Sequence, residues 1–357
     1  MQNQFPSTQF PNTRFQGSKN KLSPWIWGNI NKYNFSSVLD AFGGTGVIGY
    51  TAKQNQKEVI FNDILRSSYY NGLALIENNY ELLNKEEVDY IIRNNKLNND
   101  TFIERTFKNI YYTDEENKWL DMAIANIKEM KSIYKRAIAL SALFQSCIIK
   151  RPYNLFHRAN LYMRFADVKR GFGNKTTWDT SFEVHFKKIV KEYNDAVFNN
   201  NKENKAFNYN IFNLPSNNYD LVYIDTPYYS IHRQPTDYYS FYHFLEGLCI
   251  YVEKDSKSWY DLIDFNRKPL PLKHDTYLES NMAIWTNQKK IEKGFDDLFK
   301  KFQNSILVVS YNEDGFPSKK RIVEILSQYK KNIQIINRNY KYALRSDEVN
   351  ELLFIAY

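Results

Sequence analysis

Four consecutive residues in the second half of the chain, Asp225, Thr226, Pro227 and Tyr228, combine an acidic side chain, a constrained backbone and an aromatic ring. The residue before a proline is held extended, so the carbonyl of Thr226 and the carboxylate of Asp225 can both act as acceptors. Two such acceptors can draw the hydrogens of an exocyclic amine on a nucleobase and free its delocalised lone pair. Tyr228 adds a ring on which a base can stack. An Asp-x-Pro sequence can also simply end a strand in a turn, so the motif needs support from elsewhere.

A second candidate site lies at residues 40–49, which contain the pattern G-x-G-x-x-G at Gly44, Gly46 and Gly49. The pattern follows an expected strand, begins an expected helix and precedes an acidic residue, Asp63, at the end of the next strand. This is the arrangement of dinucleotide-binding sites. An NAD-dependent enzyme is therefore one interpretation, and a glycine turn that binds no ligand is another.

The residue that precedes this loop, Asp40, favours a different ligand. Its carboxylate would repel a pyrophosphate and suits a ligand with an ammonium group. S-adenosylmethionine is such a ligand, since it carries an amino acid at one end, a nucleoside at the other and no phosphate. We therefore expect residues 42–46 to approach its methionine part and Asp63 to accept hydrogen bonds from its ribose. The NAD-dependent alternative gives no role to residues 225–228.

The composition is that of a globular protein with a basic excess. Of the 357 residues, 43% are hydrophobic and 17% aromatic, and 48 Lys and Arg against 40 Asp and Glu give a net charge of +8. Residues 150–191 hold ten Lys and Arg and three acids, which favours a polyanionic partner. The aromatic residues can fill a core or stack against bases.

The cysteines and the apolar runs bear on the surroundings of the protein. Cys147 and Cys249 lie far apart in apolar sequence, so neither a disulfide nor a metal site is expected. The first residues lack an apolar leader, and no apolar run approaches the length of about 18 residues that a membrane helix needs. We therefore expect a protein of a reducing cytoplasm with no membrane partner.

Seven short apolar runs bounded by turn residues are expected to form strands. Most are apolar throughout rather than alternating, as in a sheet covered on both faces. These runs are 37–41, 59–62, 207–211, 221–224, 306–310, 333–337 and 352–356. The span between the second and third runs has helical patterns and is too long for one strand-to-strand crossover. We therefore expect an α/β fold whose catalytic domain comprises residues 1–70 and 205–357, with residues 71–204 inserted as a mainly helical subdomain.

Together these motifs resemble the N6-adenine-specific DNA methyltransferases of the Dam-like class. In that class the cofactor motif comes first, the catalytic motif last, and the target-recognition region between them, and the resemblance covers almost the whole chain. Residues 14–19, Arg-Phe-Gln-Gly-Ser-Lys, resemble the N-terminal cofactor motif, which usually ends in Gly-Gly-Lys, and residues 40–46 resemble the glycine-rich motif. Residues 210–212 resemble a stretch that in relatives carries an acid against the cofactor adenine. The family's catalytic motif is usually Asp-Pro-Pro-Tyr, and the carbonyl required at Thr226 is unaffected by the change from proline.

The resemblance implies a Rossmann-like S-adenosylmethionine-dependent methyltransferase sheet of about seven strands and a set of site residues. Lys19 is the expected partner of the cofactor carboxylate. The residues expected to bind the cofactor are Phe15, Gly17, Lys19, Asp40, Phe42, Gly43, Gly44, Thr45, Gly46, Asp63, Asn210, Ile211 and Phe212. Catalysis is expected from Asp225, Thr226, Pro227 and Tyr228, with Tyr340 or Tyr342 covering the base on the face opposite to Tyr228.

The inserted subdomain is expected to read the DNA target, with phosphate contacts from Lys and Arg and base-edge contacts from Arg and Asn. Residues 150–158 resemble a segment of a restriction-associated branch of the family. The candidate DNA contacts are Lys150, Arg151, Arg158, Asn160, Arg164, Lys169, Arg170 and Lys175. The loop at 230–242, with His232 and Arg233, is expected to close over bound DNA.

The activity implied by the resemblance is transfer of a methyl group from S-adenosylmethionine to N6 of an adenine flipped out of duplex DNA, without a covalent enzyme intermediate. It also implies a bacterial, cytoplasmic monomer in a restriction-modification system, with a cognate restriction endonuclease as a candidate partner. Methylation of cytosine N4, or of adenine in RNA, is the nearest alternative, because the same two acceptors would serve. A DNA-binding subunit without activity is a further alternative.

Overall fold

The chain forms two compact units, and the computed structural model describes residues 8–93, 100–166, 175–215, 219–230, 236–273, 284–340 and 349–357. The sheet unit comprises Gln16–Gly72, Asn200–Tyr238 and His274–Tyr357. The helical unit comprises Met1–Phe15, Leu73–Asn199 and Tyr239–Lys273. The helical unit therefore also contains residues 1–15 and 239–273, which we expected in the catalytic domain.

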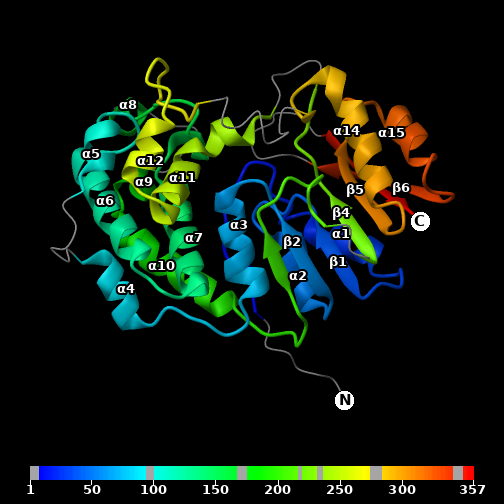
Figure 1. The fold of residues 1–357 in the computed structure, drawn as a ribbon, viewed down its shortest axis with the longest axis horizontal. Coiled ribbons are helices and arrows are strands. Elements are labelled where there is room, and N and C mark those ends of the chain that lie inside the picture. The colour runs from blue at the N-terminus through cyan, green and yellow to red at the C-terminus, as the bar shows by residue number, and fades with distance from the viewer. Residues whose placement is uncertain are drawn as a thin grey trace. The chain divides into compact units, whose positions relative to one another are not determined.

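The sheet unit is built on seven strands, shown as arrows in Figure 1. They are β1 (Ser37–Asp40), β2 (Glu58–Asn62), β3 (Lys205–Phe207), β4 (Leu221–Ile224), β5 (Ile306–Asn312), β6 (Ile333–Tyr340) and β7 (Val349–Ala356). Their order is β3-β2-β1-β4-β5-β7-β6, with β7 antiparallel to β5 and β6 and the other pairs parallel. The expected α/β fold with a sheet of about seven strands is confirmed.

The third strand is the one that we placed wrongly, at residues 207–211. β3 ends at the first residue of this run, because the asparagines that follow bond to the backbone and turn the chain out of the sheet. Asn208 Nδ2 donates to the carbonyl of Asp63 at 2.8 Å, and Asn210 Oδ1 accepts from the amide of Phe212 at 3.1 Å. The apolar residues of the run therefore line a loop at the end of the strand.

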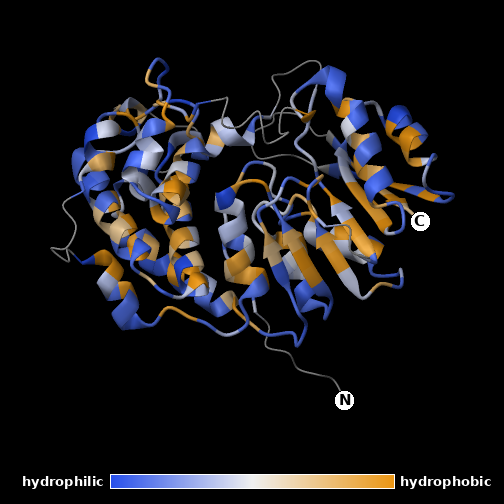
Figure 2. Ribbon diagram, viewed as in Figure 1, coloured by the Kyte–Doolittle hydropathy of each residue, from blue (hydrophilic) through white to orange (hydrophobic). Residues whose placement is uncertain are grey.

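Helices cover both faces of the sheet, which explains why most of its strands are apolar throughout. They are α1 (Ser23–Ile30), α2 (Val47–Gln54), α3 (Arg66–Gly72), α14 (Gln288–Lys301) and α15 (Lys319–Leu326). Leu39, Val222 and Leu307 share one buried cluster with the apolar faces of α14 and α15. Val38 and Val59 are also buried and, since strand neighbours alternate, lie on the opposite face, where α2 and α3 contact β1, β2 and β3. Figure 2 shows these strands as a mainly apolar layer.

The helical unit packs around α7 (Ile133–Ile149), which is buried along most of its length and contacts α6 (Asp114–Lys128) and α10 (Phe182–Ala196). The other described helices are η1 (Leu73–Glu77), α4 (Lys85–Ile92), α5 (Phe102–Thr106), η2 (Pro152–Asn154), α8 (Tyr162–Phe165), α9 (Lys175–Asp179), α11 (Tyr238–Glu253) and α12 (Ser256–Asp261). At the N-terminus of α6, Thr113 and Glu116 form a reciprocal capping box that satisfies two backbone amides. None of the helices described is long and apolar enough to cross a bilayer.

Aromatic side chains fill much of the core of the helical unit. The rings of Phe107, Tyr111, Phe244 and Trp259 lie in contact, with centroids 5.1 to 5.9 Å apart. A β-carbon at Gly247 would lie 2.0 Å from the Trp259 ring, so glycine is what lets α12 pack against α11. These rings join α11 and α12 to the helical unit, although the sequence analysis placed both helices in the catalytic domain.

Candidate active site

The catalytic motif and the glycine motif meet at one edge of the sheet. Asp40 is the last residue of β1, Asp225 directly follows β4, and these two strands are neighbours, with Asp40 in register with Tyr223. From this pair the sheet continues to β2 and β3 on one side and to β5 on the other. Open α/β sheets bind ligands at such a switch point, outside the carboxyl ends of the strands.

Lys19 reaches this edge from the N-terminal motif. Its Nζ lies 2.9 Å from both carboxylate oxygens of Asp225 and 3.6 Å from Oε1 of Glu351. The side chains of Lys19 and Glu351 are 4% and 0% exposed, whereas Asp225 is 17% exposed. We expected Lys19 to pair with the cofactor carboxylate, but here its ammonium is bound by two carboxylates of the protein. Asp225 is the member of the cluster that remains accessible to a substrate.

The surroundings of the cluster change the pKa values of its members. Burial is the largest effect on Asp225 and raises the pKa of its carboxyl, while Lys19 opposes the increase and Glu351 adds to it. Burial alone would lower the pKa of Lys19, but the two carboxylates outweigh it and the pKa of the ammonium is raised. Lys19 therefore stays charged, and Asp225 is a stronger base than an exposed aspartate, which suits an acceptor for an amine hydrogen.

Tyr228 is held through both its hydroxyl and its ring. The hydroxyl donates to Oε1 of Glu351 at 2.8 Å, and Nζ of Lys19 lies 4.8 Å from the ring centroid. Ser310 Oγ donates to the same glutamate oxygen at 2.6 Å. Glu351 and Ser310 lie far along the chain on β7 and β5, and no local pattern around them indicates a site.

Backbone geometry requires glycine in the loop of residues 42–46, which we call the glycine loop. Gly44 and Gly46 have φ angles of +55° and +85°, in the left-handed region that favours glycine. A β-carbon at Gly43 would lie 2.0 Å from the ring of Phe61 on β2. The loop therefore turns tightly from the end of β1 into α2, which starts directly after Gly46.

Two carboxylates fasten the glycine loop to its neighbours. Asp40 is 1% exposed, and its Oδ2 accepts from the amide of Gly49 in the first turn of α2 at 2.9 Å. Asp63 Oδ2 accepts from the amide of Gly44 at 2.8 Å. Burial raises the pKa of Asp40 to about 7, with the Gly49 amide opposing the increase and nearby carboxylates adding to it. A pKa near 7 would make the charge of Asp40 depend on pH in the neutral range.

Three aromatic rings, from the segments that follow β1 and β3 and from the segment that precedes α14, lie in contact. The ring of Trp285 contacts Phe42 edge-on at 5.5 Å between centroids and is nearly parallel to Phe212 at 6.3 Å. Ile211 is buried, and the side chain of Asn210 is engaged with the amide of Phe212. Trp285 could not be predicted as a site residue because it lies outside every motif that resembles the family.

The N-terminal motif divides between the two units. Gly17 has a φ of +77°, and a β-carbon there would lie 2.5 Å from the Tyr238 hydroxyl, so glycine is required. Ser18 has no such left-handed φ, which explains why serine fits where the family usually has a second glycine. Phe15 belongs to the helical unit, where its ring stacks on Tyr242 at 4.5 Å between centroids.

Comparison with known proteins identifies the family. The model of the D12 class N6 adenine-specific DNA methyltransferases matches residues 15–256, which contain both the glycine loop and residues 225–228. The chain belongs to this family. The resemblance stated from the sequence is thereby confirmed, and this D12 methyltransferase is an enzyme of the N6-adenine-specific DNA class.

Several curated relatives carry restriction-modification names. The Type II methyltransferase M2.HphI of Haemophilus parahaemolyticus is 28% identical over 357 residues, which cover 97% of this chain and 98% of the relative. The modification methylase StsI of Streptococcus sanguinis is 27% identical over 96% of this chain and 51% of its own length. The Type II methyltransferase M.FokI of Planomicrobium okeanokoites is 26% identical over 88% of this chain and 47% of its own length. The D12 methyltransferase thus matches the first relative almost end to end and spans about half of the other two.

Three basic residues that we expected at the DNA interface of this D12 methyltransferase are buried instead. Lys150 Nζ lies 2.9 Å from Oε1 of Glu116, and Arg164 donates to both oxygens of Glu116 at 2.6 and 2.7 Å. The guanidinium of Arg151 lies over the ring of Tyr111 at 4.6 Å. All three basic residues are at most 5% exposed, so in this structure they anchor the fold and present little charge to solvent.

The remaining DNA candidates differ in exposure. Arg158 and Lys175 are exposed and Asn160 is half-buried. The candidates that lie outside the described residues are Lys169, Arg170, His232, Arg233, Tyr342 and the side chain of Tyr340. Tyr162 and Phe165 on α8 are 73% and 64% exposed, and they flank the buried Arg164. Because α8 is too short for a periodic pattern, these two aromatics gave no signal in the sequence.

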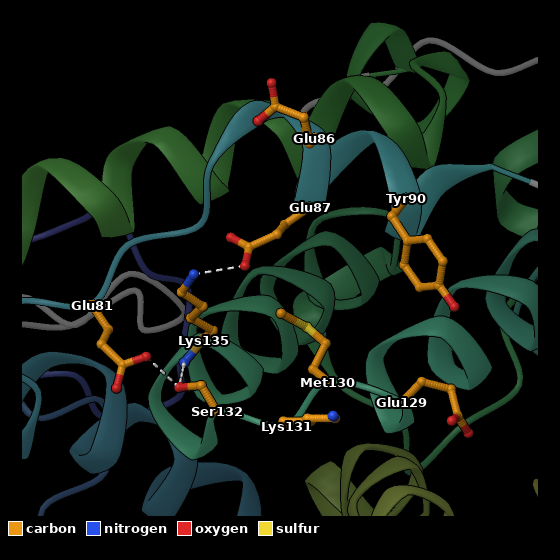
Figure 3. A pocket seen from close by; sticks show the side chains of 9 residues that line it. All are labelled: Glu81, Glu86, Glu87, Tyr90, Glu129, Met130, Lys131, Ser132 and Lys135. Carbon is orange, nitrogen blue, oxygen red and sulfur yellow. Dashed lines mark hydrogen bonds and ion pairs between the residues drawn. The ribbon is translucent and has the colours of Figure 1, made fainter.

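The helical unit also contains a hollow of about 530 Å³. It is lined by Glu81, Glu86, Glu87, Tyr90, Glu129, Met130, Lys131, Ser132 and Lys135. Figure 3 shows Lys135 paired with Glu87 at 2.6 Å and Ser132 bound to Glu81 at 2.5 Å. Its glutamates outnumber its lysines, so it does not fit a phosphate backbone. Over the described ranges of the chain, no group of His, Cys, Asp and Glu is arranged to hold a metal ion.

Proposed function

We propose that this D12 methyltransferase transfers a methyl group from S-adenosylmethionine to N6 of an adenine that is flipped out of duplex DNA. The observation that carries the proposal is the position of Asp225. It directly follows β4 at the switch point of the sheet, is partly accessible, and is bound by the ammonium of Lys19. Membership of an N6-adenine-specific DNA family supports the same reaction.

The residues at the carboxyl ends of β1, β2 and β3 fit the parts of S-adenosylmethionine. The cofactor supplies a methyl group on a positively charged sulfonium. The glycine loop presents backbone rather than side chains, which lets the methionine part approach closely. Asp40 is suited to balance the ammonium, Asp63 to accept hydrogens from the ribose, and Phe212 with Trp285 to cover the adenine.

The chemistry at the target amine needs acceptors in fixed positions. Asp225 accepts a hydrogen bond from one N6 hydrogen and the carbonyl of Thr226 accepts one from the other, which makes the nitrogen lone pair available. The methyl carbon would bond to N6 as its bond to sulfur breaks, S-adenosylhomocysteine would be the leaving group, and N6 would lose one proton. Tyr228 supports one face of the adenine. The reaction needs no covalent enzyme intermediate, and catalysis is chiefly positioning and electrostatics. Taking the base out of the duplex is required because N6 is otherwise stacked and paired.

The proposed DNA contacts in the helical unit are now Arg158, Asn160 and Lys175, joined by Tyr162 and Phe165. Arg158 and Lys175 are exposed and supply charge for phosphates. Tyr162 and Phe165 are highly exposed rings on a helix held in place by the ion pair of Arg164 with Glu116. Exposed aromatic side chains among basic residues suit stacking on bases or insertion between base steps.

The names of the relatives support a role in a restriction-modification system, in which this D12 methyltransferase protects the sites of a cognate restriction endonuclease in a bacterial cytoplasm. We propose that it acts as a monomer, because modification of one strand at a time needs no two-fold symmetry. Sedimentation at micromolar concentration, with and without DNA, tests this: a stable dimer would contradict it.

Nucleoside mass analysis tests the proposed reaction. Duplex DNA of random sequence and, in a parallel reaction, RNA are incubated with the protein and labelled S-adenosylmethionine, then digested to nucleosides. We expect N6-methyladenine from the wild type and none from Asp225→Ala. N4-methylcytosine, or methylation of RNA alone, would show one of the alternative reactions. Cofactor binding without any methylated nucleoside would show an inactive DNA-binding subunit.

A further inference from the structure

Glu351 is a buried carboxylate in an apolar strand. It lies on β7, is 0% exposed, and is followed by the fully buried Leu352 and Leu353. Burying a carboxylate is costly unless it is paired and hydrogen-bonded. Asn350 and the cross-strand partners Asn312 and Arg338 are polar, but of these residues only Glu351 places a carboxylate next to the Lys19 ammonium, so its own side-chain contacts must explain the buried charge.

The partners of Glu351 supply that explanation. Its Oε1 receives hydrogen bonds from Tyr228 at 2.8 Å and from Ser310 at 2.6 Å, and lies 3.6 Å from the ammonium of Lys19. Lys19 is also the ion-pair partner of Asp225, and Tyr228 belongs to the same motif as Asp225. One oxygen of a rigid strand therefore fixes the base-stacking ring and the cation of the catalytic cluster together.

The charge of Glu351 also affects how Asp225 can act. Lys19, Asp225 and Glu351 carry one positive and two negative charges, so the cluster keeps a net negative charge. Without Glu351, the ammonium of Lys19 would neutralise Asp225 alone and weaken it as an acceptor for the amine hydrogen. With Glu351 present, the ammonium is shared and Asp225 retains more negative charge.

We propose that Glu351 is a positioning residue for methyl transfer, which orients Tyr228 and shares Lys19 with Asp225 so that Asp225 remains a strong acceptor. This inference rests on the proposed function, because it assumes that Asp225 and Tyr228 contact the target adenine. Glu351 itself is buried and does not touch the substrate.

The proposal predicts a pH effect as well as a rate effect. Glu351 raises the pKa of Asp225, so its removal lowers that pKa and shifts the acid limb of the kcat profile to lower pH. The titratable groups around Asp225 are Lys19 of the N-terminal motif, Glu351 of β7, Tyr228 of its own loop, Tyr223 of β4 and Asp40 of β1. Of these, only Glu351 is altered in the test.

The test compares Glu351→Gln with the wild type across pH. Glutamine keeps an oxygen that accepts from Tyr228 but removes the charge. We expect kcat to fall on the order of tenfold, the acid limb to move to lower pH, and the KM values for DNA and cofactor to stay within about threefold. The matched control is Glu313→Gln, an exposed glutamate just after β5, which should leave all these quantities unchanged.

Two outcomes would overturn the proposal. Wild-type kcat and pH profile in Glu351→Gln would show that Glu351 serves the fold alone, and a loss of kcat without a shift of the acid limb would remove the electrostatic role. If Glu351→Gln does not fold, Tyr228→Phe tests the hydrogen bond from its other end. It should lower kcat several-fold, and because the Tyr228 hydroxyl lowers the pKa of Asp225, its removal should move the acid limb to higher pH, opposite to Glu351→Gln. An unchanged kcat would contradict the positioning role. If the wild type forms no N6-methyladenine, the proposed function fails instead.

Discussion

The ammonium of Lys19 lies 2.9 Å from both carboxylate oxygens of Asp225, although the two residues are 206 positions apart in sequence. The contact joins the N-terminal motif to the catalytic motif. Because the same ammonium lies 3.6 Å from Glu351, one cation serves two carboxylates. The charge available on Asp225 is therefore set by residues from three distant segments.

Lys19→Gln tests the first of these contacts. Lys19 lowers the pKa of Asp225, so its removal should raise that pKa and move the acid limb of kcat to higher pH. The rate should fall most on the acid side of the profile, because less of the carboxylate is ionised at a given pH. Lys21→Gln, at an exposed position nearby, is the control. An unchanged pH profile with lost cofactor binding would instead support our original expectation that Lys19 binds the cofactor carboxylate.

Asp40 should make cofactor binding depend on pH. Its pKa is raised to about 7 by burial, and only the ionised form balances the ammonium of S-adenosylmethionine. Affinity should therefore decrease as pH falls below about 7 and level off above it. Calorimetric titration between pH 6 and 8 measures this, and Asp40→Asn should bind more weakly at pH 8 without the dependence. A wild-type affinity that is constant over this range would contradict the role of Asp40.

The local motifs were predictable from the sequence because each is a continuous segment whose residues act together. Acidic residues at or just after the expected strand ends, Asp40, Asp63 and Asp225, predicted that the site lies at the carboxyl edge of the sheet. The structure places Asp40 and Asp225 at the ends of the neighbouring strands β1 and β4. The spacing of the apolar runs along the chain also predicted an α/β sheet with a long helical region between the second and third strands. Only β3 was misplaced, since its end is decided by asparagine contacts with the turn after β2.

Contacts between distant segments were not predictable in the same way. Glu351 and Trp285 join the site through strand pairing and helix packing, and neither has a local pattern. From the sequence, Lys150 and Arg164 were predicted to be surface charges. In the structure both form buried ion pairs with Glu116, which lies on α6 and is distant in sequence. A count of basic residues cannot distinguish cations that face solvent from cations that hold helices together.

Glu116→Gln should destabilise the helical unit. The change leaves Lys150 and Arg164 buried without their carboxylate, a loss that costs about 3 to 5 kcal/mol for a buried pair. Chemical denaturation followed by circular dichroism measures the free energy of unfolding. Glu115→Gln, exposed on the same turn of α6, should change it by less than about 0.5 kcal/mol. Equal effects of the two substitutions would show that the buried ion pairs do not stabilise this unit.

The exposed rings of α8 should contribute to DNA binding. Combined replacement of Tyr162 and Phe165 by alanine removes two contacts worth about 1 to 3 kcal/mol each where a ring stacks on a base. The Kd for duplex DNA should rise about tenfold or more, with the Kd for cofactor unchanged. Tyr80→Ala removes a ring that is equally exposed, at 73%, elsewhere in the helical unit, and should have little effect. If the double variant and Tyr80→Ala lose DNA affinity to the same extent, or if neither variant loses any, the proposed role of α8 in the interface would be contradicted.

The most direct test of the account is the single-turnover rate of methyl transfer by Asp225→Asn. The substitution keeps the shape of the side chain but removes the charge that accepts the amine hydrogen. We expect the rate to fall on the order of 100- to 1,000-fold while cofactor affinity stays within about threefold, and Asp261→Asn, an exposed aspartate of α12, to match the wild type. A rate in Asp225→Asn within about threefold of the wild type would contradict the central claim that the Asp225 carboxylate activates the target amine.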